Sequence, residues 1–111
     1  MILLEEISKD KNSFRELCQR HNVKSLYGFG SSVTDRFDTE NSDIDLLVEI
    51  DEDDSLERGN KLLSLWDNFE IFFNRKVDML TATSIQNPYL KRSIDATKIL
   101  IYDRDGSQIF I

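Results

Sequence analysis

The sequence predicts an α/β (α+β) fold in which helices pack against a small mixed β-sheet. Two segments, 43–50 and 76–80, contain alternating apolar residues and read as strands, and each carries aspartate on one face. Segments with apolar residues at helical spacing precede, separate and follow these strands. A chain in which strands alternate with helices in this way is typical of a sheet covered by helices.

Length, charge and cysteine usage limit the classes of protein to consider. The 111 residues, 40% hydrophobic and 32% charged, predict one globular domain over 1–111. A net charge of −7 argues against direct binding of nucleic acid and favours a basic protein partner or a metal ion. A lone cysteine, Cys18, and the absence of a signal sequence or a membrane-length apolar run predict a cytoplasmic protein without membrane contact.

The N-terminal half predicts a helix followed by two strands. Ser13 and Glu16 form a capping-box pattern for a helix that ends near His21, which we expect at the surface. A strand is expected over 24–29, running into the glycine- and serine-rich turn 28–32. In the next strand one face is wholly apolar, through Ile44, Leu46, Val48 and Ile50.

The C-terminal half predicts two more helices and a closing strand. The acidic segment 51–55 caps a long helix, in which Ile71 and Phe72 widen the apolar surface towards a partner or the core. Its buried stripe is expected to contain Leu56, Leu62, Leu63, Trp66, Phe69 and Phe73. Asn87 and Pro88 start a short helix carrying Leu90 and Ile94. A strand over 97–102 and an Asp105-Gly106 turn precede the tail Ile109-Phe110-Ile111.

Aspartates at alternate positions of a strand are candidate metal ligands. Asp43 and Asp45 project to the same face about 6 to 7 Å apart, so their carboxylates can converge on divalent ions. Such a pair repels itself unless a cation or hydrogen bonds offset the like charges. Asp78 interrupts the second strand and lies beside this pair if the two strands are neighbours. Three carboxylates suit Mg²⁺, which completes its shell with water and substrate phosphates.

The turn before the first aspartate is a candidate phosphate site. In Gly28-Phe29-Gly30-Ser31-Ser32 the glycines allow close approach of the backbone, and N–H groups at the start of a helix attract phosphate. Each pattern alone is common, but the combination of turn, paired aspartates and a third strand aspartate is specific.

Three segments together resemble the minimal nucleotidyltransferases of the DNA polymerase β superfamily. These are Tyr27-Gly28-Phe29-Gly30-Ser31-Ser32, Ser42-Asp43-Ile44-Asp45-Leu46-Leu47-Val48 and Val77-Asp78-Met79-Leu80. The resemblance implies that Gly30 and Ser31, with Ser32, hold the triphosphate of ATP. It also implies that Asp43, Asp45 and Asp78 bind two Mg²⁺ ions, and that Asp78 helps to deprotonate an acceptor hydroxyl. Small members of this family pair as antitoxins with HEPN-domain toxins, and some transfer AMP to a toxin tyrosine.

Two departures from the family pattern concern the phosphate site. Many members have an arginine directly after the Gly-Ser pair, where this chain has Ser32-Val33-Thr34, and the segment to the first aspartate is about one residue longer. Arg36 is the nearest substitute, with a surface ion pair to Asp35, Asp38 or Glu40 as the alternative.

Two alternatives remain open, and a third is rejected. In the first alternative the chain is an antitoxin that acts only by covering its partner. In the second it is a transferase for a small molecule, which would require a homo-oligomer or a partner subunit to enclose the acceptor. A calcium-binding loop in 35–54 fails, because the central glycine and closing glutamate of an EF-hand are not placed around Asp43 and Asp45.

Overall fold

A computed structural model describes residues 1–34, 36–106 and 108–109, in which a five-stranded mixed sheet has the order β3-β2-β1-β4-β5. β2 and β3 are parallel, and the other neighbouring strands are antiparallel. The mixed sheet predicted from the sequence is therefore confirmed. The strands are β1 (Val23–Gly28), β2 (Ile44–Ile50), β3 (Val77–Leu80), β4 (Ile99–Asp103) and β5 (Gln108–Ile109).

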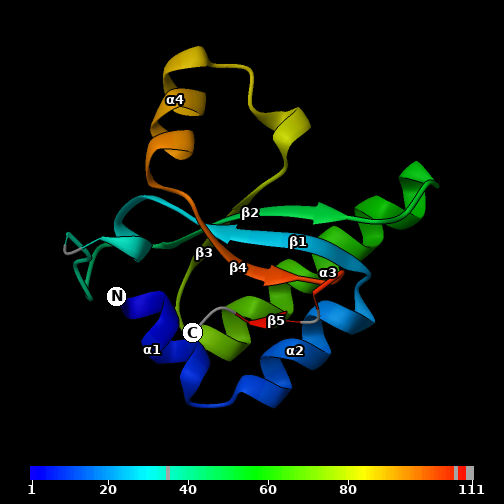
Figure 1. Cartoon of the computed structure of the whole chain (residues 1–111), viewed down its shortest axis with the longest axis horizontal. Coiled ribbons are helices and arrows are strands. Elements are labelled where there is room, and N and C mark those ends of the chain that lie inside the picture. The colour runs from blue at the N-terminus through cyan, green and yellow to red at the C-terminus, as the bar shows by residue number, and fades with distance from the viewer. Residues whose placement is uncertain (35, 107, 110–111) are drawn as a thin grey trace.

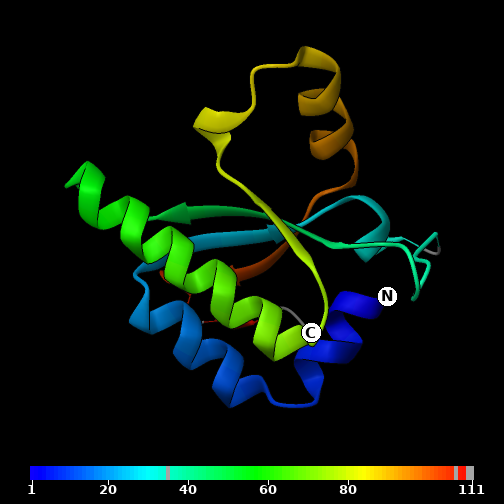
Figure 2. The same cartoon turned by 180° about the vertical axis from the view of Figure 1, so that it is seen from behind.

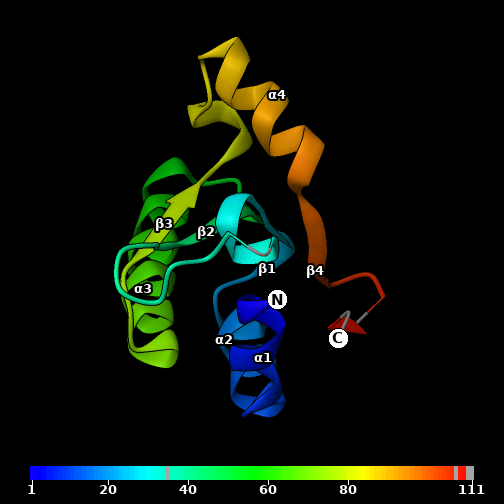
Figure 3. The ribbon, with the colours of Figure 1, turned by 90° about the vertical axis from the view of Figure 1, so that its left-hand side faces the viewer.

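Helices cover the two faces of the sheet unequally. On one side lie α1 (Ile2–Ser8), α2 (Lys11–Arg20) and α3 (Ser55–Phe73), as Figures 1 and 2 show. On the other side α4 (Pro88–Thr97) and the short 3-10 turn η2 (Ala82–Ser84) stand above the strands, which the edge-on view of Figure 3 makes clear. Part of this second face therefore stays open beside α4.

The hydrophobic core lies between the sheet and the three-helix side. The predicted apolar face of β2 is buried there, together with Leu65, Phe69 and Phe73 of α3. Leu56 and Leu63, expected in the same stripe, are instead 70% and 63% exposed. At 3.6 residues per turn both lie on the side of α3 opposite Leu65, so the apolar stripe is narrower than predicted.

The N-terminal helices differ from the sequence prediction in two ways. α1 was not predicted, because Glu5 and Glu6 interrupt its apolar residues, yet Leu3 and Ile7 are fully buried one turn apart. The second helix begins earlier than expected, because the carboxylate of Asp10, not Ser13, caps it. That carboxylate accepts from the backbone N–H of Ser13 at 3.1 Å and from its hydroxyl at 2.7 Å.

His21 is a further correction, since it is only 6% exposed instead of lying at the surface. Its Nδ1 donates to the carbonyl of Leu17 at 2.8 Å, and its Nε2 lies 2.9 Å from the Ser64 hydroxyl. The ring therefore links the end of α2 to α3 and has a structural role.

The C-terminal third follows the prediction closely. Asn87 caps α4 through its side-chain oxygen, and Ile94 is buried, although Leu90 is 41% exposed. β4 and β5 form the predicted hairpin around the Asp105-Gly106 turn. The tail residues Phe110 and Ile111 lie outside the described residues. None of the helices in the described ranges is both long and apolar enough to span a membrane.

Candidate active site

The parallel pairing of β2 and β3 brings the strand aspartates together. Asp45 is the register partner of Asp78, and the N–H of Ile44 donates to the carbonyl of Lys76 at 3.0 Å at the start of the pair. Because side chains alternate along a strand, both aspartates face away from the buried Ile44 and Val77. Asp43 directly precedes β2 at the same end. All three carboxylates thus belong to the open side of the sheet.

The pKa of Asp45 is raised by its surroundings. Burial, together with the negative charges of Asp78 and Asp43, raises its pKa to about 6. A carboxylate shifted in this direction by like charges is stabilised in its ionised form by a nearby cation.

The bend after β1 brings the backbone against Asp45. Gly30 has φ +64°, which L side chains rarely adopt, and a Cβ there would lie 2.7 Å from Oδ2 of Asp45. The N–H of Phe29 donates to the carbonyl of Asp45 at 3.1 Å. Gly30 then begins the 3-10 turn η1 (Gly30–Val33). The glycine therefore permits both the backbone turn and the close approach to the carboxylate.

Ser32 connects this turn to the aspartate strand. Its side chain is fully buried, and its hydroxyl accepts from the N–H of Asp45 at 2.8 Å and lies 3.4 Å from the carbonyl of Asp43. The hydroxyl is thus engaged with β2 and faces inward. This geometry fits a positioning role better than the phosphate contact that we predicted.

Thr97, at the end of α4, also holds the bend and was not recognised from the sequence. Its hydroxyl accepts from the N–H of Gly30 at 3.1 Å and donates to the carbonyl of Ser93 at 3.1 Å. The two partners are 67 residues apart, and the sequence pattern around Thr97 favours a strand instead of a helix end. No local pattern signals such a contact.

The remaining predicted phosphate ligands lie at the surface of the same region. Ser31 is partly exposed next to Gly30, whereas Arg36 is exposed in the segment that leads to β2. Within the described residues the Arg36 side chain has no ion-pair partner, and only its backbone N–H is bonded, to the Thr34 hydroxyl at 3.3 Å. Asp35, one of its predicted partners, lies outside the described residues. The contacts of Ser31 and Arg36 with phosphate stay predictions.

The edge strand β3 is held by two side chains of α3. The carboxylate of Glu70 accepts from the N–H of Val77 at 2.9 Å, and the indole N–H of Trp66 donates to the carbonyl of Val77 at 2.7 Å. These backbone groups are the ones that point away from β2. The residue before Asp78 is therefore fixed on both sides.

The match to a family model agrees with this arrangement. Residues 12–107 match the model described as "Polymerase beta, Nucleotidyltransferase". The chain belongs to this nucleotidyltransferase family. The match spans all three aspartates, the Gly30 bend and Thr97.

This nucleotidyltransferase is similar to named proteins both in sequence and in fold. It is 40% identical over 87 residues, 78% of this chain and 85% of the relative, to "Putative protein adenylyltransferase MJ0126" of Methanocaldococcus jannaschii. A solved structure named as a putative minimal nucleotidyltransferase superposes with a TM-score of 0.67 at 26% identity, covering 89% of this chain and 95% of that one. A toxin–antitoxin complex with AMP-PNP shares the fold, with a TM-score of 0.62 at 19% identity over 88% and 77% of the two chains.

The donor set of this nucleotidyltransferase fits hard divalent cations. Carboxylate oxygens are ligands that Mg²⁺ prefers, and a cation beside Asp45 would offset the burial and the like charges that raise its pKa. In the described part of the chain no group of three or more His, Cys, Asp or Glu side chains is arranged to hold a metal ion by itself. Mg²⁺ commonly keeps several waters and binds through one or two carboxylates plus substrate phosphates, so an open set is adequate. The metal-binding roles of Asp43, Asp45 and Asp78 remain predictions.

Proposed function

We propose that this chain is a Mg²⁺-dependent protein adenylyltransferase, which transfers AMP from ATP to a hydroxyl group of a partner protein. The observation that carries the proposal is the register pairing of Asp45 with Asp78 beside the Gly30 bend. Membership of the nucleotidyltransferase family and the 40% identity to a protein named as an adenylyltransferase support it.

The three aspartates and the Gly30 bend would have separate roles in the reaction. Asp43 and Asp45 would hold two Mg²⁺ ions, which neutralise charge on the triphosphate and the departing pyrophosphate. Ser31, next to the Gly30 bend, would contact the phosphates, because the N–H of Gly30 already donates to the Thr97 hydroxyl. Asp78 would share one ion and accept the proton of the acceptor hydroxyl, whose oxygen bonds to the α-phosphorus as the bond to pyrophosphate breaks. Since β3 is an edge strand and Asp78 is exposed, a protein acceptor can reach it.

The acceptor that we propose is a HEPN-type toxin, which makes this chain an antitoxin. The shared fold with a toxin–antitoxin complex that contains an ATP analogue supports this partner. The net charge of −7 is complementary to a basic nuclease.

A second candidate is an antitoxin that neutralises its partner by binding alone. Leu56, Leu63 and Ile71 of α3 are 63% to 78% exposed, which is a surface suited to a protein contact. On this reading the aspartates would not be required for neutralisation.

The experiment combines the purified chain, Mg²⁺ and the protein encoded by the neighbouring gene with ATP labelled at either the α- or the γ-phosphate. AMP transfer labels the partner from α-labelled ATP only. The double variant Asp43→Asn with Asp45→Asn should abolish labelling, whereas Asp53→Asn with Asp67→Asn, a matched loss of two exposed carboxylates, should retain it. Absence of α-label on the partner, together with inhibition of the partner by the Asp43/Asp45 variant, would establish the binding-only antitoxin instead.

A further inference from the structure

The side of α3 that faces away from the sheet carries exposed apolar residues. Leu56, Leu63 and Ile71 lie on it, and they are three of the six large apolar side chains that are exposed among the described residues. Single exposed apolar residues are common on soluble proteins, but several on one helix face mark a contact surface. Figure 2 shows this helix at the front of the molecule, beside α2 and on the side of the sheet opposite to α4.

The three side chains form a line along the helix. Leu63 follows Leu56 by seven residues and Ile71 follows Leu63 by eight, so each step is two helical turns, about 10 to 12 Å. The whole line is therefore about 22 Å long. A second helix lying alongside α3 would match it, because apolar residues on one face of a helix recur at similar steps.

A groove between α2 and α3 adjoins the C-terminal end of this line. It has a volume of about 280 Å³, and Leu17, Ile71 and Phe72 give it apolar walls. Glu16 and Arg20 also line it, and their opposite charges leave the groove without net charge. An apolar side chain of a partner that is buried in such a groove can supply much of the binding free energy.

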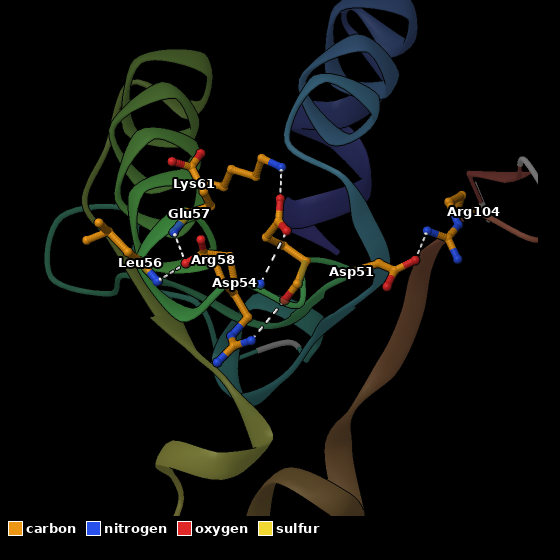
Figure 4. A network of polar contacts seen from close by, with 8 residues as sticks. Asp51, Asp54, Leu56, Glu57, Arg58, Lys61 and Arg104 are labelled. Atoms are coloured by element: carbon orange, nitrogen blue, oxygen red, sulfur yellow. Dashed lines mark hydrogen bonds and ion pairs between the residues drawn. The ribbon is translucent and has the colours of Figure 1, made fainter.

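The charged groups on this face of α3 are acidic. Glu57 and Asp67 are exposed on the same side of the helix as the apolar line, and neither side chain has an ion-pair partner within the described residues. The cations of α3 are engaged elsewhere. A guanidinium N–H of Arg58 donates to the carbonyl of Glu52 at 2.8 Å, and the ammonium of Lys61 binds the Glu52 carboxylate at 2.6 Å, as Figure 4 shows. The negative charge of the face is therefore not offset within α3.

The start of α3 is ordered before any partner binds. The carboxylate of Asp54 accepts from the backbone N–H of Leu56 at 2.9 Å and from that of Glu57 at 3.4 Å (Figure 4). The contacts of Arg58 and Lys61 tie the same end of the helix to the segment after β2. Binding at this face therefore does not have to order the helix, which lowers its cost in entropy.

We propose that this face of α3 is a docking surface for an amphipathic helix of a partner protein, in which apolar residues are flanked by lysine or arginine. The apolar residues of that helix cover Leu63 and Ile71 and enter the groove, and its cations meet Glu57 and Asp67. The surface lies on the side of the sheet opposite to the aspartate cluster, so docking does not require the proposed AMP transfer.

A second copy of this chain fits the surface less well. A two-fold pair of chains would place the same face of α3 against itself. In an antiparallel pair that brings Leu63 against Leu63, Glu57 of one copy comes within about one helical turn of Asp67 of the other. These like charges repel each other, whereas a helix with cations at its borders is attracted.

The test uses two fluorescent helical peptides of about 18 residues, long enough to span the apolar line. Both carry the same line of leucines, which is flanked by lysines in the first peptide and by glutamates in the second. Fluorescence anisotropy should show that the original chain binds the lysine peptide at least about tenfold more tightly than the glutamate peptide.

Replacement of the apolar line tests its share of the binding. Leu63→Ser with Ile71→Ser should lower the affinity for the lysine peptide at least about tenfold, because the peptide leucines lose their apolar contacts. Both residues are exposed, so the variant keeps its core, which circular dichroism verifies. Leu90→Ser, which removes an exposed leucine of α4, should leave the affinity unchanged.

Charge reversal tests the chemistry of the partner. Glu57→Lys with Asp67→Lys should reverse the preference, so that the glutamate peptide becomes the tighter ligand. Equal affinity for the two peptides, binding of neither, or unchanged affinity after replacement of Leu63 and Ile71 would overturn the proposal. A dimer of the original chain in sedimentation that this double replacement abolishes would also overturn it, in favour of self-association. None of these outcomes depends on AMP transfer, so failure of the proposed function is a separate result.

Discussion

At the scale of single residues, Gly30 allows both the backbone bend after β1 and its close approach to the Asp45 carboxylate. Its positive φ, and the 2.7 Å that would separate a Cβ at this position from Oδ2 of Asp45, exclude a side chain here. Gly30→Ala should lower AMP transfer by about a hundredfold, because the bend and the carboxylate must move apart. It should also lower the free energy of unfolding by about 1 to 3 kcal/mol.

Gly59→Ala is the matched comparison for stability. Gly59 lies inside α3 with open space around its Cα, so alanine should raise the free energy of unfolding by about 0.5 to 1 kcal/mol. Thermal denaturation of both variants and a rate of AMP transfer for Gly30→Ala measure these effects. Equal stability changes in the two variants would contradict the account of Gly30.

The raised pKa of Asp45 predicts that this carboxylate destabilises the metal-free fold at neutral pH, although the proposed function requires it. Its pKa in the folded chain, about 6, lies above the ordinary 3.8, so the folded state holds more protons than the unfolded state between these pH values. Without metal, this group therefore stabilises the fold below about pH 4 and loses that contribution as pH rises through 6. Asp45→Asn removes a charge that is half-buried and repelled by Asp78 and Asp43. At pH 7 it should therefore exceed the original chain in free energy of unfolding by on the order of 1 kcal/mol, a value reduced by solvent screening.

Urea denaturation at pH 4 and pH 7 in the presence of a chelator measures this difference. At pH 4 the two chains should be nearly equal, and added Mg²⁺ at pH 7 should stabilise the original chain but not Asp45→Asn. A variant that is less stable than the original chain at pH 7 without metal would show that the carboxylate is not strained by its neighbours.

At the scale of elements, the geometry of the site depends on how α3 holds β3. Removing the Glu70 carboxylate leaves the N–H of Val77 without its partner at the sheet edge, so Asp78 loses its fixed position. Glu70→Ala should lower the rate of AMP transfer about tenfold or more and raise the Mg²⁺ concentration needed for half the maximal rate. Glu70→Gln retains an acceptor oxygen and should restore most of the rate.

Magnesium titration of the transfer rate separates this role from plain stabilisation. If Glu70→Ala lowers only the melting temperature, with an unchanged magnesium requirement, the contact does not position Asp78. Trp66→Phe tests the second hydrogen bond between α3 and Val77, because it removes the indole N–H that donates to the Val77 carbonyl while keeping an aromatic ring.

Elements also show what can be read from a single sequence. The strands carrying Asp45 and Asp78, and the position of Asp43 just before the first of them, could be predicted because alternation along a strand is a local property. Helix α1 was missed because its glutamates interrupt a short run of apolar residues. Its burial also depends on a contact with a distant part of the chain, since Leu3 packs so closely on Gly28 that a Cβ there would meet the Leu3 side chain. The contacts of Thr97 with Gly30 and of Glu70 with Val77 depend on the fold as a whole, so no local pattern could predict them.

At the scale of the whole molecule, the charge balance sets the order in which ligands bind. The chain carries −7 and has three carboxylates gathered on one face, so a triphosphate without metal is repelled. The two Mg²⁺ ions that we propose among these carboxylates would reverse the local charge, and bound phosphates would complete their coordination. Metal and nucleotide should therefore each raise the affinity of the other, by the same factor in both directions.

Thermal denaturation of the intact chain tests this coupling. With Mg²⁺ present and ATP at about a hundred times its dissociation constant, the native state gains about 2.7 kcal/mol. For a chain of this size that corresponds to a rise in melting temperature of about 10 °C. ATP with a chelator should give no rise, Mg²⁺ alone a small one, and Asp43→Asn with Asp45→Asn none under any condition. An equal rise with ATP and chelator would mean that the nucleotide binds without the aspartates, because repulsion from an uncompensated carboxylate cluster would otherwise prevent it.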